Sequence, residues 1–426
     1  MNRVFRRRNL IAWLIVVSAF SGCGKSKQEA SPNNETAQRA PADTTQLHRP
    51  SLNIVAHPPD AFYDPPANIS SEHGVLLKSE VVKNVILPPG MLAWRIQYTT
   101  TVDDKTPALG VAMVFAPKEM PALPRPMIAW THGTTGLMQK CMPSLSSAPS
   151  EGIAARDKIV GQGWVVVATD YSYTEKGGPH PYLMGEAEAR SVLDAMRAVY
   201  HMPELTLDRR HAMVWGHSQG GHAALWSGIM APRYAPDVKL AGVIAIAPFA
   251  DPLSIIRMNP PVDKRLGPYI AMSYSRFYSD IKFEEAIRSP ALEASRKIAN
   301  LCGFIPLEDA HEIDALASSF EGGALAIDTN HALVARLEEN AANGAIAAPL
   351  VIVQGMADMV VPPAATNAYV DTRCAAGQQI EYWTFSRLDH TSIVAPESAL
   401  TEPLFTWVQA RLNDEPQQAG CVKSNY

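Results

Sequence analysis

The pattern of apolar and polar positions changes character along the chain. Residues 79–87, 93–101 and 109–116 show alternating or β-branched patterns, and Pro-Pro-Gly and Asp-Asp-Lys turns separate them. This pattern predicts an antiparallel meander of three strands. From residue 126 onward, short apolar runs alternate with segments of helical period, which predicts a mainly parallel sheet with helices on both faces.

The alternating part of the chain is interrupted once by a long stretch of helical pattern. We expect residues 249–345 to form a helical cap over the carboxyl ends of the strands, between two parts of one α/β core at 56–248 and 346–426. The expected strands of that core are 126–131, 163–169, 212–215, 240–247, 350–354 and 379–385, and the expected helices are 151–161, 185–201, 221–229, 364–371 and 402–412.

The first 55 residues are expected to lie outside the fold. Four arginines among the first eight residues precede an apolar run at 10–20 that is too short to span a bilayer. Ser21-Gly22-Cys23 then resembles a bacterial lipobox, so residues 1–22 read as a signal peptide of lipoprotein type with lipidation at Cys23. The alternatives are a plain secretory signal cleaved nearby and, as the export route, a twin-arginine signal at Arg7-Arg8. The polar segment 23–55 is predicted to be a disordered tether to the membrane, the outer membrane in a Gram-negative source.

Charge and cysteine usage narrow the possible partners. The net charge is -5 and the sequence pI about 6.2, and no long basic stretch follows the N-terminus. We therefore expect no nucleic-acid partner.

Besides Cys23 there are four cysteines, which in an exported chain suggest two disulfides with three possible pairings. Without a C-x-x-C pair we expect no structural zinc, and our default assembly is a monomer.

The most informative motif is Gly-x-Ser-x-Gly at residues 216–220, which reads Gly-His-Ser-Gln-Gly. An apolar strand pattern at 211–215 precedes it, and a helical pattern follows it. Strand, tight turn and helix together predict a nucleophile elbow with Ser218 at its tip. The helix N-terminus would favour the negative charge that develops there. The alternative is an ordinary glycine-rich turn.

A serine hydroxyl needs a base to take its proton, and the base needs a carboxylate to orient it. In this architecture the chain order is serine, acid, histidine. Asp358 follows the expected strand 350–354, and His390 follows the expected last strand, so we predict a triad of Ser218, Asp358 and His390. Asp389 is a rival acid, but a sequence neighbour rarely forms an in-line bond with the imidazole.

An oxyanion formed at Ser218 needs two backbone donors. We expect one to be the N–H of Gln219, directly after the nucleophile, and the other the N–H of Thr134, with Gly133 as the alternative. His132 is expected to brace this loop. The two histidines that flank the elbow, at positions 217 and 222, are expected to serve packing.

Several short motifs together resemble the secretory lipase family, a branch of the α/β-hydrolases. They run from about Phe62 to the C-terminus and comprise His-Gly-Thr-Thr-Gly at 132–136, Cys-Met-Pro-Ser at 141–144, Thr-Asp-Tyr at 169–171, His-Pro-Tyr at 180–182, the run 191–198, Gly-His-Ser-Gln-Gly-Gly-His at 216–222 and Gly-x-x-Asp-x-x-Val-Pro at 355–362. The resemblance implies the α/β-hydrolase fold with a helical cap, ester substrates, the same triad and no metal or organic cofactor. It also implies the disulfides Cys141–Cys302 and Cys374–Cys421. The lipid anchor departs from the family, whose better-known members are free secreted enzymes.

The leading functional hypothesis is a serine hydrolase that cleaves carboxylic esters with an apolar acyl group, a lipase or esterase, through an acyl-enzyme on Ser218. A peptidase or amidase could use the same triad, but no charged specificity pocket or propeller domain is evident in the sequence. A surface lipoprotein that only binds is the third hypothesis, and the complete set of triad residues argues against it.

Overall fold

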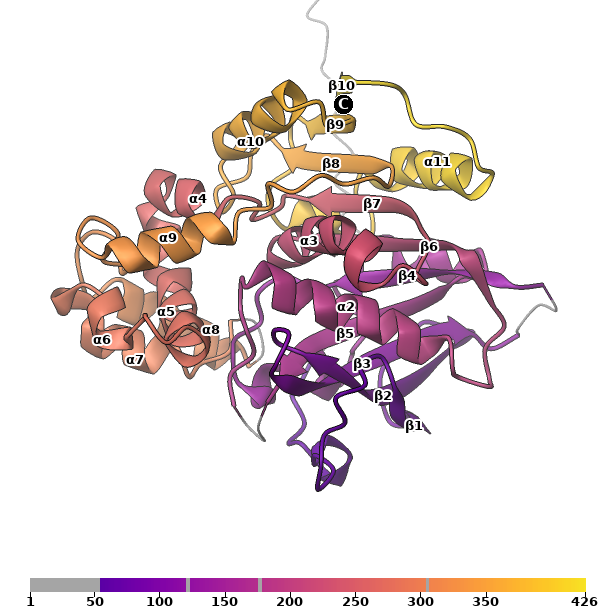
Figure 1. Ribbon diagram of the computed structural model, residues 1–426, viewed down its shortest axis with the longest axis horizontal. Helices are drawn as coiled ribbons and strands as arrows, with labels where there is room; N and C mark the ends of the chain where they lie inside the picture. The colour runs from indigo at the N-terminus through magenta and orange to yellow at the C-terminus, as the bar shows by residue number, and fades with distance from the viewer. Residues whose placement is uncertain (1–53, 120–122, 175–177, 304–305) are drawn as a thin grey trace, which may run out of the picture. The chain divides into compact units, whose positions relative to one another are not determined.

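A ten-stranded sheet organises the structure (Figure 1). The computed structural model describes residues 54–119, 123–174, 178–303 and 306–426, so the predictions for the signal peptide and nearly all of the tether lie outside the described residues. The strand order is β1-β2-β3-β5-β4-β6-β7-β8-β9-β10. The strands are β1 (Leu76–Val81), β2 (Met91–Thr101), β3 (Pro107–Pro117), β4 (Arg125–Thr131), β5 (Val165–Tyr173), β6 (Leu207–His217), β7 (Leu240–Ile246), β8 (Leu350–Gly355), β9 (Ile380–Phe385) and β10 (Cys421–Asn425).

The sheet is antiparallel at its N-terminal edge and parallel elsewhere. β1 to β3 form the predicted meander, and β3 pairs antiparallel with β5, whereas every pair from β5–β4 onward to β9–β10 is parallel. The prediction for the first strand was displaced, since β1 lies at 76–81 and not at 79–87. The edge strand β10 was not predicted, because its alternation is short and its side chains are exposed or half-buried.

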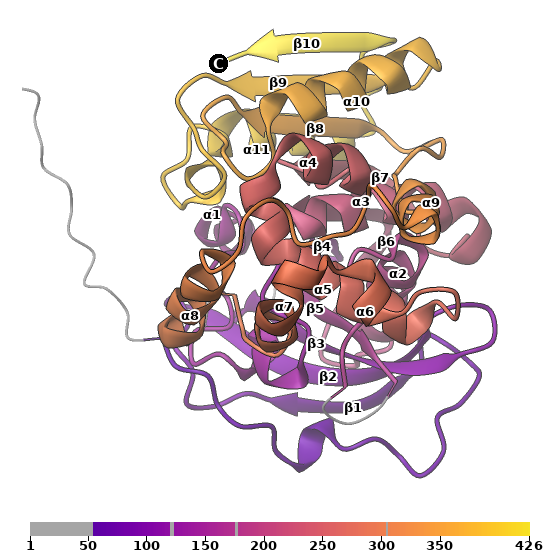
Figure 2. The ribbon, with the colours of Figure 1, turned by 90° about the vertical axis from the view of Figure 1, so that its left-hand side faces the viewer.

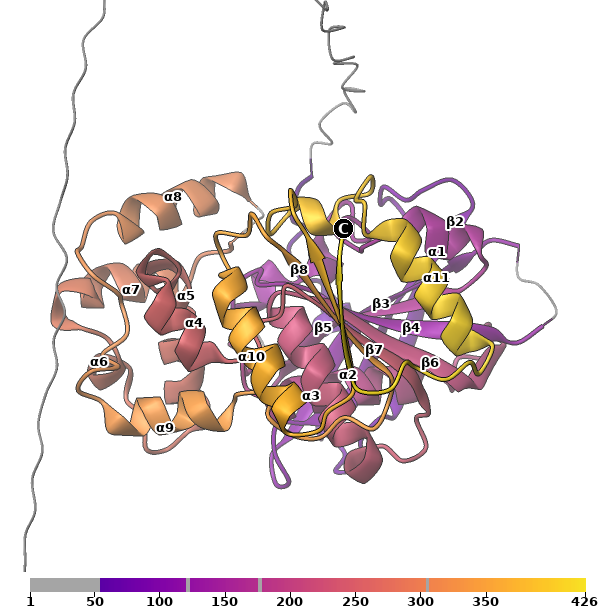
Figure 3. The same cartoon turned by 90° about the horizontal axis from the view of Figure 1, so that it is seen from above.

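Helices cover both faces of the sheet. Figure 3 shows α2 (Gly185–Val199), α3 (Gln219–Tyr234) and α10 (Pro363–Ala375) on one face, and α1 (Arg156–Gly161) and α11 (Thr401–Leu412) on the other. Each face has its own apolar core of strand and helix side chains. Helix α1 is shorter than predicted because Gly152 and Ala155 both have left-handed backbone angles, with φ of 79° and 54°, which a continuous helix does not allow.

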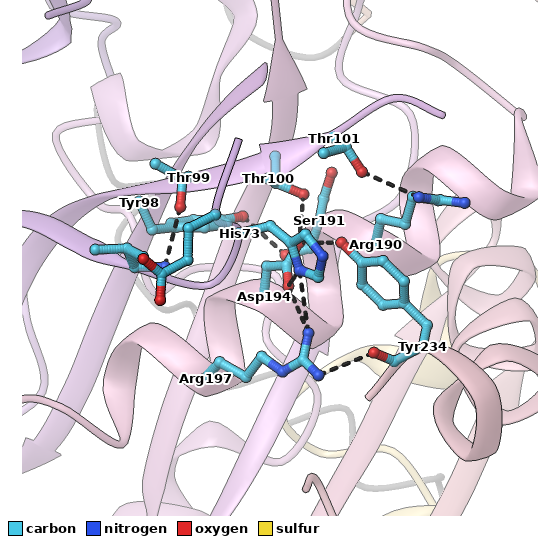
Figure 4. A network of polar contacts seen from close by, with 12 residues as sticks. His73, Tyr98, Thr99, Thr100, Thr101, Arg190, Ser191, Asp194, Arg197 and Tyr234 are labelled. Carbon is cyan, nitrogen blue, oxygen red and sulfur yellow. Dashed lines mark hydrogen bonds and ion pairs between the residues drawn. The ribbon is translucent and has the colours of Figure 1, made fainter. Parts of the chain in front are cut away.

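Helix α2 is buried almost all round and carries a polar network on its side toward β2 (Figure 4). The carboxylate of Asp194 is fully buried and accepts hydrogen bonds from Thr100 Oγ1 at 2.8 Å and Tyr234 Oη at 2.6 Å. His73 Nδ1 lies 3.3 Å and Arg197 Nη1 3.2 Å from it. A buried charge is tolerated only when it is paired and hydrogen-bonded, so this network holds strand, helix and N-terminal segment in one arrangement.

Among the described residues, six α-helices form an insertion between β7 and β8, within the range expected for a cap. They are α4 (Pro252–Met258), α5 (Pro260–Phe277), α6 (Phe283–Ala286), α7 (Leu292–Ile298), α8 (Leu307–Ala317) and α9 (His331–Glu339). Their side chains form most of a separate apolar core, which includes Tyr269, Tyr274 and Leu333. The insertion lies beyond the carboxyl ends of the parallel strands, as the arrowheads of β7 and β8 in Figure 1 show, and Figure 2 shows its helices in front of the sheet. Among the described residues no helix combines the length and apolar character needed to cross a membrane.

Two disulfides connect distant parts of the chain. They are Cys141–Cys302 and Cys374–Cys421, the pairs that the family resemblance implied. The first joins the segment after β4 to the residues after α7, across a sequence separation of 161 residues. The backbone N–H of Gly303 donates to Thr135 O at 2.8 Å beside it. The insertion is therefore fixed covalently to the loop that borders the elbow.

A buried carboxyl group in the insertion gives a prediction for stability against pH. Asp263 is 3% exposed, and burial raises its pKa from 3.8 to about 7, although the N–H of Leu325 donates to its oxygens at 3.2 and 3.3 Å. The native state thus binds a proton more strongly than the unfolded state, so this group lowers the free energy of unfolding as pH rises from about 4 to about 7. Relative to wild type, Asp263→Asn should therefore be more stable at pH ~8 than at pH ~5 in urea denaturation. A stability difference that is the same at both pH values would contradict this assignment.

Candidate active site

The elbow at the end of β6 is held in a strained conformation. Ser218 has φ of 61° and ψ of -120°, a region that residues with a side chain rarely adopt. A Cβ at Gly216 would lie 2.0 Å from Thr131 Oγ1, and one at Gly220 would lie 1.8 Å from Thr131 O. Both positions must therefore be glycine for β4 to approach the turn. Thr131 Oγ1 also lies 3.0 Å from Trp215 O and 2.7 Å from Gly220 O, which clamps the turn on both sides.

The structure brings together the three residues predicted to form a triad. His390 Nε2 lies 2.9 Å from Ser218 Oγ, and His390 Nδ1 lies 2.7 Å from Asp358 Oδ2. A carboxylate can only accept, so Nδ1–H donates to Asp358, and Nε2 is left to accept the serine proton. The three side chains come from the ends of β6, β8 and β9, whose carboxyl ends meet at one edge of the sheet.

The loop around Asp358 holds its carboxylate in position as a hydrogen-bond acceptor. Its side chain is fully buried, and Oδ1 accepts the N–H groups of Val360 and Val361 at 2.8 Å each. Gln354 Nε2 lies 3.3 Å from Oδ2. Hydrogen bonds of this kind stabilise the ionised carboxylate in a dry environment.

The rival acid Asp389 is occupied elsewhere. It is exposed, and Oδ1 accepts from the backbone N–H groups of Ser392 at 2.8 Å and Thr391 at 3.0 Å. These bonds, that of Ser392 first, hold the pKa of Asp389 at about 2. Among the described residues the carboxylate bonded to His390 is Asp358, so Asp389 shapes the loop that carries the histidine.

The loop expected to supply an oxyanion donor packs directly against the elbow. A Cβ added at Gly133 would lie 3.4 Å from Ser218 Cβ, and Tyr171 Oη donates to His132 O at 2.8 Å. His132 Nδ1 lies 2.6 Å from Gly133 O, so it donates to that carbonyl and braces the loop as expected. Thr134 Oγ1 is bonded to Tyr182 Oη at 2.7 Å. Gln219 is the first residue of α3, and an N–H at this helix position has no intrahelical partner, which leaves it free for an anion.

The sequence analysis missed a buried charged cluster beneath the elbow. Glu188 of α2 is fully buried and accepts from Gln219 Nε2 and His222 Nδ1, both at 2.8 Å. His222 Nε2 lies 2.7 Å from Asn340 O and must donate to it, because a carbonyl oxygen only accepts. His222 therefore does more than pack, since it links the nucleophile helix to the end of α9. Helix α2 is buried on most faces and carries several charged residues, so the sequence gives no signal that Glu188 in particular lies inside.

A second connection between the insertion and the site was also missed. Asn259, at the junction of α4 and α5, is 9% exposed, and its Nδ2 lies 2.8 Å from Met359 O and 3.1 Å from Val360 O. Both carbonyls belong to the loop that carries Asp358. Helical pattern cannot reveal this contact, because the partners are a hundred residues apart in the sequence.

The described residues contain no group of three or more histidine, cysteine or acidic side chains that could hold a metal ion. The chemistry available from the described side chains is that of a hydroxyl, an imidazole and a carboxylate in contact. Such a chain generates a nucleophile without a metal.

Comparison with known proteins finds similarity to lipases. The secretory lipase family model matches residues 156–267. Lipase A of Moesziomyces aphidis is 28% identical over 200 residues, which cover 43% of this chain and 41% of that protein. The probable inactive lipase MT1628 of Mycobacterium tuberculosis is 22% identical over 380 residues, which cover 84% of this chain and 82% of that protein.

Among solved structures, the closed state of Candida antarctica lipase A superposes with a TM-score of 0.68 at 18% identity. The superposition covers 86% of this chain and 89% of that one. The expected α/β-hydrolase fold is thereby confirmed. Over residues 156–267 the chain is therefore similar to the secretory lipase family, and its fold is that of the α/β-hydrolases.

Proposed function

We propose that this protein hydrolyses carboxylic esters, as a lipase or esterase, through an acyl-enzyme formed on Ser218. The observation that carries the proposal is the unbroken chain of contacts from Ser218 Oγ through His390 to the buried carboxylate of Asp358. The proposed triad comes entirely from one chain, so a monomer suffices for activity. Ester cleavage is favoured over amide cleavage because the named relatives include lipases and the trichothecene C-3 esterase of Fusarium sporotrichioides.

In the acylation step, His390 Nε2 accepts the proton of Ser218 as Oγ attacks the ester carbonyl. The carbonyl oxygen gains a negative charge, which the N–H groups of Gln219 and of Thr134, or alternatively Gly133, would stabilise. The tetrahedral intermediate then collapses, the bond to the alcohol oxygen breaks, and the imidazolium gives its proton to that oxygen. Asp358 stays ionised and stabilises the imidazolium throughout.

In the deacylation step, water replaces the alcohol. His390 takes a proton from the water, hydroxide attacks the acyl carbon, and the same backbone donors hold the second oxyanion. Collapse releases the carboxylic acid and returns the proton to Ser218 Oγ. No group of the enzyme is consumed, so Ser218, His390 and Asp358 end the cycle in their starting states.

One similar protein is a probable inactive lipase, which supports a non-catalytic role as the alternative. The proposal therefore needs a direct test. Ser218→Ala should lower kcat for p-nitrophenyl acetate by several orders of magnitude with the fold unchanged, because the imidazole then has no hydroxyl to activate. Ser227→Ala is the matched control, since the hydroxyl of this buried serine of the same helix donates to Ala223 O, one turn earlier. A purified Ser218→Ala variant that kept a tenth of the wild-type rate would exclude Ser218 as the nucleophile.

The protein is an exported one, as the secretory family and the secreted relatives from Malassezia indicate. We propose further that Cys23 is lipidated and anchors the enzyme to a membrane. The support is the sequence alone: a basic start, a short apolar run, a lipobox-like Ser-Gly-Cys and a polar tether. Two or more acyl chains suffice for stable attachment.

The anchor can be tested separately from catalysis. In the source organism, wild-type activity should sediment with membranes and need detergent for release. Cys23→Ala should leave kcat/KM for p-nitrophenyl acetate at the wild-type value, because the predicted tether would separate residue 23 from the folded domain. It should either release the enzyme or leave an uncleaved precursor. A wild-type protein that is wholly soluble and begins at a residue other than Cys23 would contradict the anchor.

A further inference from the structure

Glu188 lies where the supports of both expected oxyanion donors meet. Its side chain is fully buried, and a single carboxylate oxygen, Oε1, accepts from Gln219 Nε2 at 2.8 Å and from the backbone N–H of Leu183 at 3.0 Å. The other oxygen, Oε2, lies 2.8 Å from His222 Nδ1. Because the whole side chain is shut off from solvent, any effect of Glu188 on a substrate has to pass through these neighbours.

The first neighbour carries an expected oxyanion donor. Gln219 directly follows the nucleophile and is 1% exposed. Its side chain is anchored to Glu188, while Ser218 before it is held at a φ of 61°. With the side chain and the preceding residue both fixed, the N–H of Gln219 has little freedom to turn. An oxyanion hole requires such fixed donors, because they need no reorganisation as the charge develops.

The second neighbour leads to the loop of the other expected donor. Leu183 forms a turn with a φ of 52°, and its N–H points to Glu188. The residue before it, Tyr182, is 1% exposed, and its Oη bonds Thr134 Oγ1 at 2.7 Å. The position of Thr134 therefore depends on the turn that Glu188 holds.

We propose that Glu188 is a positioning residue for the oxyanion hole. Its Oε1 aligns the N–H of Gln219 directly and that of Thr134 through the turn at Leu183. This inference rests on the proposed ester hydrolysis. Acylation and deacylation both pass through an oxyanion, so loss of this alignment slows both steps. Because both steps slow together, kcat should fall while KM changes little.

Each of the two connections can be cut by a variant of similar volume. Gln219→Met removes the amide bonded to Glu188 and keeps the backbone N–H, and Tyr182→Phe removes the hydroxyl bonded to Thr134. For p-nitrophenyl acetate each should lower kcat by roughly tenfold with KM within about twofold, because small displacements in an active site are costly. The inhibition constant of trifluoromethyl hexyl ketone, whose adduct with Ser218 carries an oxyanion, should rise by the same factor. That of methyl hexyl ketone should not change.

Variants of Glu188 itself separate hydrogen bonding from charge. Glu188→Met removes every acceptor of this side chain and should lower kcat by roughly a hundredfold. Glu188→Gln keeps a carbonyl oxygen in the place of Oε1, and its new amide would donate to Nδ1 of a neutral His222, whose Nε2 still donates to Asn340 O. This variant should therefore restore most of the wild-type kcat.

Asp194→Asn is the matched control for the loss of a buried carboxylate. Asp194 also lies on α2 and is fully buried, but its partners belong to the network of Figure 4 and not to the oxyanion loop. The control should lower the urea midpoint of unfolding and leave kcat and both ketone inhibition constants at the wild-type values. A Glu188 variant that only loosened the fold would behave in the same way.

Two results would overturn the inference. One is a wild-type kcat and a wild-type constant for the trifluoromethyl ketone in both Gln219→Met and Tyr182→Phe, and this pair decides the question even if Glu188→Met does not fold. The other is a Glu188→Gln variant as slow as Glu188→Met, which would assign the effect to the charge of Glu188. A wild type that does not hydrolyse p-nitrophenyl acetate would contradict the proposed function itself, a result distinct from both.

Discussion

The active site depends on one close approach, that of the end of β4 to the turn between β6 and α3. The turn holds Ser218 at a positive φ, and such a conformation persists only where its surroundings determine it. Thr131 does this from one side, with its hydroxyl between two carbonyls of the turn and its backbone within contact of Gly220. The residues directly after Thr131 form the proposed oxyanion loop. The same contact therefore positions the nucleophile and the donors that its reaction needs.

The helical insertion is tied to this site at three places and is not an independent lid. A disulfide joins it to the segment after the oxyanion loop, Asn340 connects α9 to His222 behind the nucleophile, and Asn259 holds the loop of Asp358. Each link contacts a different part of the proposed machinery. A displacement of the insertion would thus also displace the nucleophile helix and the loop that carries Asp358.

Local pattern predicted the parts of the site that lie at strand ends. Chain order and the ends of three apolar strands were enough to select Ser218, Asp358 and His390, which the structure brings into contact. The charged contacts behind them could not be predicted. Glu188 and His222 are 34 residues apart, and His222 and Asn340 are 118 apart, so their meeting depends on how α2, α3 and α9 pack. Strand β10 was missed for a related reason. Its local pattern is weak, and its place in the sheet depends on its pairing with β9, beside the Cys374–Cys421 bridge.

The central claim is that ester cleavage passes through a covalent intermediate on Ser218. Acid quenching of the wild type during turnover of p-nitrophenyl acetate, followed by mass spectrometry of the intact chain and its peptides, tests it most directly. The account predicts an initial burst of nitrophenol and a chain heavier by one acetyl group, with the acetyl mapped to Ser218. Steady turnover with an unmodified chain, or an acetyl group that turns over on any other residue, would contradict it.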